Sequence, residues 1–197
     1  MTPTPAGQGP PAPQTSAPKA VFAENAVATP GPGTVRVKYP DGGYTRLRRA
    51  TEIPVGTVID AAKGRVLITI EAGGKLYAAN FSGGVFQFRQ PRKLKGTAEM
   101  RLAGGTFARC KGRRSTSSGN KVTGNPIRRL WAAGSGPFRI MGRYSSSITK
   151  RGTWLTEDRC DSTLTIVKKD SVVVRDFKTR KRTTVKARRR YLAHQGR

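Results

Sequence analysis

The residues best suited to chemistry in this sequence are a few carboxylates, two cysteines and one histidine. The only close grouping of acids is Glu157, Asp158 and Asp161. A general acid–base pair needs two opposed carboxylates in a pocket, and a calcium site needs further oxygen ligands at loop spacing. We instead expect these acids to form ion pairs at a polar corner between a strand and a turn. The candidate partners are Arg151, Arg159 and Lys168.

Nucleophilic and metal chemistry both lack the residues that they need. The serines at 145–147 have no histidine nearby in the sequence to activate them, because the single histidine, His194, is the fourth residue from the end. Two cysteines and one remote histidine do not supply the four ligands of a structural zinc site. We therefore predict that the chain is not an enzyme, binds no metal and uses no cofactor. A carboxylate-based hydrolase ranks far behind the binding functions considered below.

The cysteines, Cys110 and Cys160, have 49 residues between them. In an exported protein an even pair of cysteines predicts a disulfide bond. In a cytosolic protein the same pair would be two unrelated buried thiols. The spacing alone favours neither reading.

Positive charge is the strongest signal in the composition, with 38 Lys and Arg against 11 Asp and Glu and a net charge of +27. Such a charge favours an acidic partner, namely nucleic acid, anionic lipid or an acidic envelope polymer. It is also typical of the solvated surface of a protein from an Arg-rich proteome. Residues 109–129 hold seven bases and no acid, and residues 175–197 hold ten bases and one acid.

Aromatic residues that could stack on nucleic-acid bases are not interleaved with either basic segment. We therefore expect unselective binding of polyanions and disfavour specific recognition of nucleic acid. The residues expected to bind polyanions are Arg113, Arg114, Lys121, Arg128, Arg129, Lys181, Arg182, Arg188, Arg189 and Arg190.

The elements that would position these residues are short strands. Two alternating runs at 34–38 and 44–48 flank a Pro-Asp-Gly-Gly turn and predict a β-hairpin. Residues 64–71 form the clearest strand, because they are rich in β-branched side chains. Further strands are expected at intervals of about ten residues, separated by Gly turns, and they include 106–108, 144–148 and 153–156. The sequence predicts an all-β sandwich or short β-roll of about ten to twelve short strands, with no helix.

Composition also sets the expected boundaries. Eight of the 13 prolines fall within residues 1–33, so residues 1–32 are predicted to be a disordered Pro-rich linker. The β domain is expected over 33–193, with a mobile basic loop at 111–126, and residues 194–197 are expected to be a tail. No membrane insertion is expected, because no apolar run approaches the roughly 18 residues of a membrane helix.

Two stretches of the sequence resemble FecR-type domains. The first contains Ile53-Pro54-Val55-Gly56-Thr57 between the alternating runs that precede it and the strand at 64–69. The second begins with Arg151-Gly152-Thr153 and continues through β-branched runs to Tyr191. The chain departs from the family pattern at 169–171 and 187–188, where the family has Gly. The segment from Trp154 onward is similar to a divergent branch of the family found in exported bacterial proteins.

This resemblance implies a non-catalytic extracellular or envelope-side module, with a binding or structural role in a longer exported protein. Its partner would be an unidentified protein or envelope polymer. A cytoplasmic location, and a basic nucleic-acid-binding β-protein, stay as the alternatives. Because the resemblance implies export, and each cysteine is the other's only possible partner in the chain, we predict a disulfide between Cys110 and Cys160.

Overall fold

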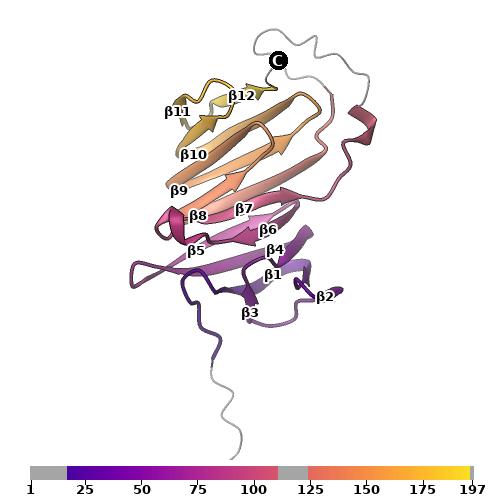
Figure 1. Cartoon of the computed structure of the whole chain (residues 1–197), viewed down its shortest axis with the longest axis vertical. Coiled ribbons are helices and arrows are strands. Elements are labelled where there is room, and N and C mark those ends of the chain that lie inside the picture. The colour runs from indigo at the N-terminus through magenta and orange to yellow at the C-terminus, as the bar shows by residue number, and fades with distance from the viewer. Residues whose placement is uncertain (1–16, 111–123, 196–197) are drawn as a thin grey trace, which may run out of the picture.

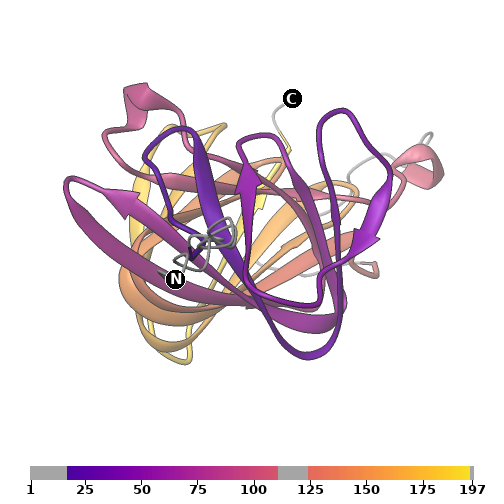
Figure 2. The same cartoon turned by 90° about the horizontal axis from the view of Figure 1, so that it is seen from below.

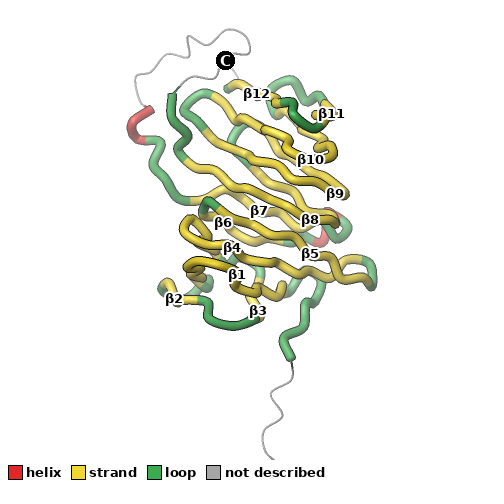
Figure 3. Tube along the Cα trace, turned by 180° about the vertical axis from the view of Figure 1, so that it is seen from behind, coloured by secondary structure: helices red, strands yellow, loops and turns green. Residues whose placement is uncertain are grey.

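The computed structural model describes residues 17–110 and 124–195, and these residues form one sheet of twelve strands (Figure 1). Two 3-10 turns, η1 (Arg92–Leu94) and η2 (Ala108–Cys110), are the only helical segments in the described ranges (red in Figure 3). Neither has the length and apolar character needed to cross a membrane. The all-β class and the expected number of strands are confirmed. The strands are β1 (Asn25–Lys38), β2 (Tyr44–Arg46), β3 (Thr51–Pro54), β4 (Val58–Ala72), β5 (Lys75–Ser82), β6 (Val85–Arg89), β7 (Ala98–Ala103), β8 (Arg128–Met141), β9 (Ser145–Asp158), β10 (Ser162–Asp176), β11 (Arg182–Lys186) and β12 (Arg190–His194).

Several strands are longer than the sequence predicts. The strands β1, β4, β8, β9 and β10 each contain 14 or 15 residues. Two runs expected to form separate strands, 144–148 and 153–156, belong to one continuous strand, β9, apart from Tyr144, which precedes it. Residues 106–108, expected as a strand, instead lead into η2. The long strands continue because β-bulges bend them where turns were expected.

The long strands build two layers, because each pairs with different neighbours along its two halves. The first layer contains β3, β5 and β12 beside the first halves of β1, β8 and β10 and the second halves of β4 and β9. The second layer contains β2, β6, β7 and β11 beside the remaining halves. The five strands β4, β5, β8, β7 and β6 form a closed hydrogen-bonded ring. Figure 2 shows the strands curving around a common interior.

Glycine permits the bends between the layers. Gly33 on β1 pairs with Gly64 on β4, and a Cβ added to Gly33 would lie 2.3 Å from the carbonyl oxygen of Lys63. On β8, Gly136 has a φ of +125°, and a Cβ there would lie 2.6 Å from the Cβ of Tyr77. A side chain at these positions would push neighbouring strands apart, so the bends depend on its absence.

The interior between the layers is filled by aliphatic and aromatic side chains. The Phe81 ring lies 5.3 Å from Phe86 and 5.8 Å from Phe138, measured between centroids. Burial of each large apolar side chain contributes about 1.5–3 kcal/mol, so this cluster is the main source of cohesion between the layers. The largest fully buried side chains are Trp154, Phe81, Phe86, Phe88, Phe138, Ile53, Ile59, Ile68, Ile70, Met100, Leu102 and Leu130.

The domain begins earlier than the expected boundary at residue 33, which is a correction to the predicted linker. Ala20 is 4% exposed, and Ala26 and Ala28 on β1 are fully buried. The backbone N–H of Lys19 donates to the carboxylate of Glu52. Residues 20–32 fall within the predicted linker because eight of the 13 prolines lie in residues 1–33, among them Pro30 and Pro32. Both prolines lie where β1 bends and its register shifts, and proline is tolerated at such irregular positions.

The other predicted boundaries fall partly outside the described residues. Most of the expected mobile loop at 111–126, namely residues 111–123, lies outside the described residues. The same holds for residues 1–16 of the predicted linker. His194 belongs to β12, and the backbone N–H of Gln195 donates to the carbonyl of Asp161. The domain therefore extends through the first residues of the predicted tail.

A chain that starts at Thr34 tests the N-terminal boundary against one that starts at Ala17. The shorter chain loses the first half of β1, with its buried side chains and its pairing to β3 and β4. We expect a loss of about 4 kcal/mol or more in the free energy of unfolding, which lowers the melting temperature by roughly 10 °C. Equal melting temperatures for the two chains in calorimetry would contradict this assignment.

Candidate functional site

The expected acidic corner contains a fully buried carboxylate. Asp158, at the end of β9, accepts hydrogen bonds from Arg128 Nε at 2.7 Å, Thr163 Oγ1 at 2.6 Å and the backbone N–H of Arg143 at 2.8 Å. These donors come from β8, from β10 and from the β8–β9 turn. A buried carboxylate is stable only when its charge and lone pairs are satisfied. Asp158 therefore ties together three segments of the fold.

The neighbouring acid has a separate partner. Glu157 pairs with Arg159 at 2.7 Å, as the sequence analysis expected. The counter-charge of Asp158 comes instead from Arg128 on β8, because the pairing of β8 with β9 sets these two residues opposite each other. Consecutive residues of a strand point to opposite faces, so the two carboxylates do not share a pocket.

The serines at 145–147 belong mainly to the buried interior. Ser147 Oγ accepts a hydrogen bond from Trp154 Nε1 at 3.0 Å and lies 3.0 Å from Thr156 Oγ1. Ser145 is fully buried. The side chain of Ser146 points to the opposite face of β9 from Ser145 and Ser147, where it lines a groove on the outer surface.

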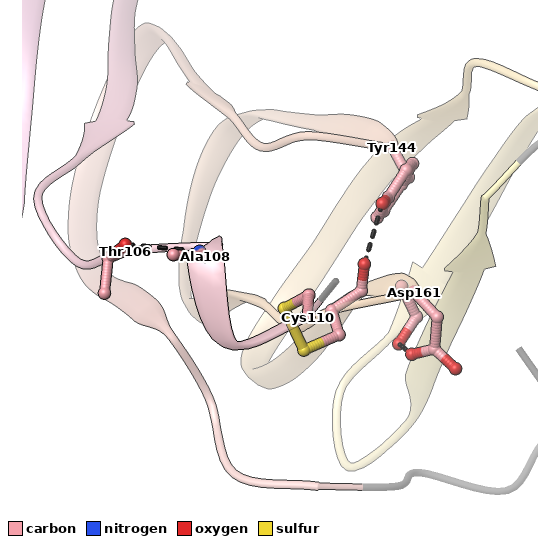
Figure 4. The surroundings of a disulfide bond; sticks show 7 residues. Thr106, Ala108, Cys110, Tyr144 and Asp161 are labelled. Atoms are coloured by element: carbon pink, nitrogen blue, oxygen red, sulfur yellow. Dashed lines mark hydrogen bonds between the residues drawn. A yellow bond between two sulfur atoms is a disulfide. The ribbon is translucent and has the colours of Figure 1, made fainter. Parts of the chain in front are cut away.

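The two cysteines are joined by a disulfide, as predicted (Figure 4). The Cα atoms of Cys110 and Cys160 are 5.3 Å apart, within the usual range for disulfides. The bond connects the end of η2 to the turn between β9 and β10. The hydroxyl of Tyr144 donates to the carbonyl of Cys160 at 2.8 Å, which Figure 4 marks with a dashed line. Burial raises the pKa of this Tyr144 hydroxyl above its usual value.

Arg128, one of the predicted polyanion ligands, already has partners within the fold. Besides its ion pair with Asp158, its guanidinium lies 5.0 Å from the ring centroid of Phe107. Arg143 lies 4.4 Å from the same ring centroid. Replacing Arg128 would leave a buried carboxylate without its counter-charge, so this residue is structural.

The other predicted polyanion ligands do not form one patch. Arg129 and Arg190 lie on strands of the first layer, whereas Lys181 and Arg182 lie at the far edge of the second layer. The turn before β12 carries two more exposed bases, Arg188 and Arg189. The three remaining predicted ligands, Arg113, Arg114 and Lys121, lie outside the described residues.

The structure gathers a different set of bases on the outer face of the second layer. Register places Arg101 of β7 opposite Met141, Met141 opposite Ser146, Ser146 opposite Arg175, and Arg175 opposite Arg182 of β11. These residues form a row that crosses five adjacent strands. A groove of about 340 Å³ follows part of this row. We call it the basic groove, and its bases are Arg89, Lys93, Arg101, Arg139 and Arg175.

The basic groove keeps most of its positive charge. Its single acidic lining residue, Glu99, forms an ion pair with Arg139. None of the other four bases forms an ion pair with a carboxylate in the described parts of the chain. Arg139 Nε is buried and has no hydrogen-bond partner among the described residues. Phe177, which is 40% exposed, is the aromatic residue at the rim.

Chemical reduction tests the disulfide. Neither cysteine should react with an alkylating agent until a reductant is added, as mass measurement would show. A Cys110→Ser, Cys160→Ser variant should lose about 4 kcal/mol of stability by the chain-entropy model, because the bond closes a loop between residues 50 apart. Alkylation of both thiols in the untreated protein would contradict the bond.

Alkaline pH tests the buried hydroxyl of Tyr144. Because burial raises its pKa in the folded state, its contribution to stability is complete below pH 10 and is lost as the pH rises through the folded value. A Tyr144→Phe variant should therefore lose less stability between pH 9 and 11.5 than the parent chain. Tyr44→Phe, at a ring that is 48% exposed, is the matched control and should keep the parent's pH profile.

Comparison with protein-family models, with curated proteins and with solved structures finds no match for this chain.

Proposed function

We propose that this chain is a non-catalytic binding module that holds an acidic polymer in the basic groove, on the extracellular or envelope side of a cell. The observation that carries the proposal is the row across β7 to β11, in which register places Arg101, Arg175 and Arg182 on one face, with the uncharged Met141 and Ser146 between the first two bases. Guanidinium groups bind carboxylates, sulfates and phosphates through paired hydrogen bonds.

The dimensions of the row suit a polymer. Neighbouring strands lie about 4.8 Å apart, so the row from β7 to β11 extends roughly 19 Å. An extended polyanion lying across the strands would meet cations at both ends of this distance. The bases are long, flexible side chains, so they would attract many polyanions with little selectivity.

The proposed location rests on the disulfide and on the resemblance to FecR-type domains. Stable disulfides form in oxidising compartments and are rare in the cytosol. The Cys110–Cys160 bond therefore supports an exported module.

Nucleic-acid binding ranks second because the basic groove lacks a stacking platform. Proteins that bind single strands combine basic side chains with several aromatic rings. Phe177 is the single aromatic residue among the described residues that line the groove, and it lies at the rim. A row of charges without stacked rings favours a polymer recognised by its charge.

Binding measurements on a groove variant test the proposal. The variant Arg89→Gln, Arg101→Gln, Arg175→Gln removes three charges from the groove. In the parent chain, heparin and unrelated DNA sequences should compete about equally, and binding should weaken steeply as salt rises. In the variant, the slope of log K against log salt should fall by about two to three, because each lost contact to DNA contributes roughly 0.9.

The matched control carries the same loss of charge elsewhere. Lys38→Gln, Arg46→Gln, Arg48→Gln removes three exposed bases near β1 and β2, outside the groove. This control should keep nearly the full salt slope, and an equal loss in both variants would mean that net charge alone drives binding. A preference of about a hundredfold or more for one nucleic-acid sequence at physiological salt would instead support the nucleic-acid function.

A further inference from the structure

A second pocket lies on the opposite face of the protein from the basic groove. It occupies about 270 Å³ on the outer face of the first layer. The pairing of β4, β5, β8 and β9 brings its lining together, because Arg65 is opposite Ser82, Ser82 is opposite Trp131, and Ala133 is opposite both Asn80 and Thr153. The side chains that carry its chemistry are Arg65, Asn80, Ser82, Trp131, Thr153 and Lys168.

The indole of Trp131 gives the pocket an aromatic wall. The chain has two tryptophans, and Trp154 is 1% exposed in the core, whereas Trp131 is partly exposed on the outer face. Trp131 lies beside the β5–β6 turn, where a Cβ added to Gly83 would be 3.5 Å from its Cδ1 atom. A partly exposed indole next to polar side chains is a common feature of binding sites rather than of cores.

The polar groups around the indole are of two kinds. Asn80, Ser82 and Thr153 each offer a donor and an acceptor, which are the groups that bind hydroxyls. Arg65 and Lys168 offer two cations, each of which can bind a carboxylate. No acidic residue is among the described residues that line the pocket.

We propose that this pocket binds one acidic sugar residue, a hexuronate, of a polysaccharide. The apolar face of the sugar ring would pack on Trp131, and the amide and hydroxyl side chains would bond its hydroxyls. Arg65 on β4 and Lys168 on β10 stand at opposite ends of the row of strands that build the pocket, so they would bind carboxylates at the two ends of the bound polysaccharide segment. The volume lies just below the usual range of about 300–1,000 Å³ for small-molecule sites, so it suits a single sugar ring. The inference does not depend on the basic groove, because the two sites share no lining residue.

A nucleotide is the competing ligand, since a base could also stack on Trp131. The lining favours the sugar, because three neutral polar side chains surround the indole and match several hydroxyls at once. Sequence-independent binding of single strands relies on further aromatic rings for successive bases. Trp131 is the single aromatic residue among the described residues that line this pocket.

Tryptophan fluorescence can follow binding at this pocket directly. Trp154 is shielded by the core, so quenching by acrylamide reports mainly on Trp131. The probes are trimers of galacturonate, of mannuronate and of guluronate, with a neutral galactose trimer and the dinucleotide pTpT for comparison. At least one uronate trimer should protect Trp131 in a saturable manner, and its affinity should exceed that of the neutral trimer by about tenfold.

Variants locate the binding independently of fluorescence. In calorimetric titrations with the best uronate trimer, Arg65→Gln and Lys168→Gln should each weaken binding about tenfold, through loss of a charged hydrogen bond. Lys75→Gln, an exposed base at the β4–β5 turn, is the matched control and should bind as the parent chain does. The basic-groove variant should also bind the trimer as the parent chain does.

Four results would overturn the inference, and the fourth would do so by assigning the sugar to the basic groove. The first is no saturable protection by any uronate trimer. The second is equal affinity for the acidic and neutral trimers. The third is tighter binding of the dinucleotide than of every uronate trimer, which would assign the pocket to nucleic acid. Loss of trimer binding in the basic-groove variant alone would place the sugar in the groove, and would leave the proposed polymer binding intact.

Discussion

The close approach of strands at their bends is the constraint on which the rest of this structure depends. Where β1 crosses β4, the two backbones leave no room for a side chain at Gly33. Because β4, β8, β9 and β10 contribute to both layers, each supplies side chains to more than one surface. A side chain inserted at such a bend would shift both outer faces together, even though the two candidate sites share no residue.

Local sequence patterns predicted the class of fold, but they did not predict that neighbouring short runs join into long continuous strands. Alternating apolar residues and Gly-rich turns were enough for the strands near 64–71 and for the first hairpin. The bends were mistaken for turns, because a glycine in a bulge and a glycine in a loop look alike in sequence. The first half of β1 was missed because its small side chains are buried by other strands, and this burial depends on contacts distant in sequence.

The candidate binding surfaces also depend on contacts between residues that are distant in sequence. The spacing of the two cysteines left a disulfide and free thiols equally open, and the disulfide was predicted because the resemblance implies export and only one pairing exists. The basic groove was not predictable, since Arg101 and Arg139 lie outside the two basic segments and only strand register brings them to the same face as Arg175. The bases that do cluster in sequence lie on separate layers, or outside the described residues. The sequence does place a base at an outward-facing position in several strands. This pattern indicates a shared basic surface only when the order of the strands in the sheet is known.

The disulfide also changes what a protease can do to this chain. A single cut anywhere between Cys110 and Cys160 leaves both pieces linked through sulfur, so no fragment is released. The strands β8 and β9 lie within that covalent ring and stay hydrogen-bonded to β5, β7 and β10 on either side. A nick in this region would change the mass seen on a reducing gel, while the nicked molecule would remain in one piece under oxidising conditions.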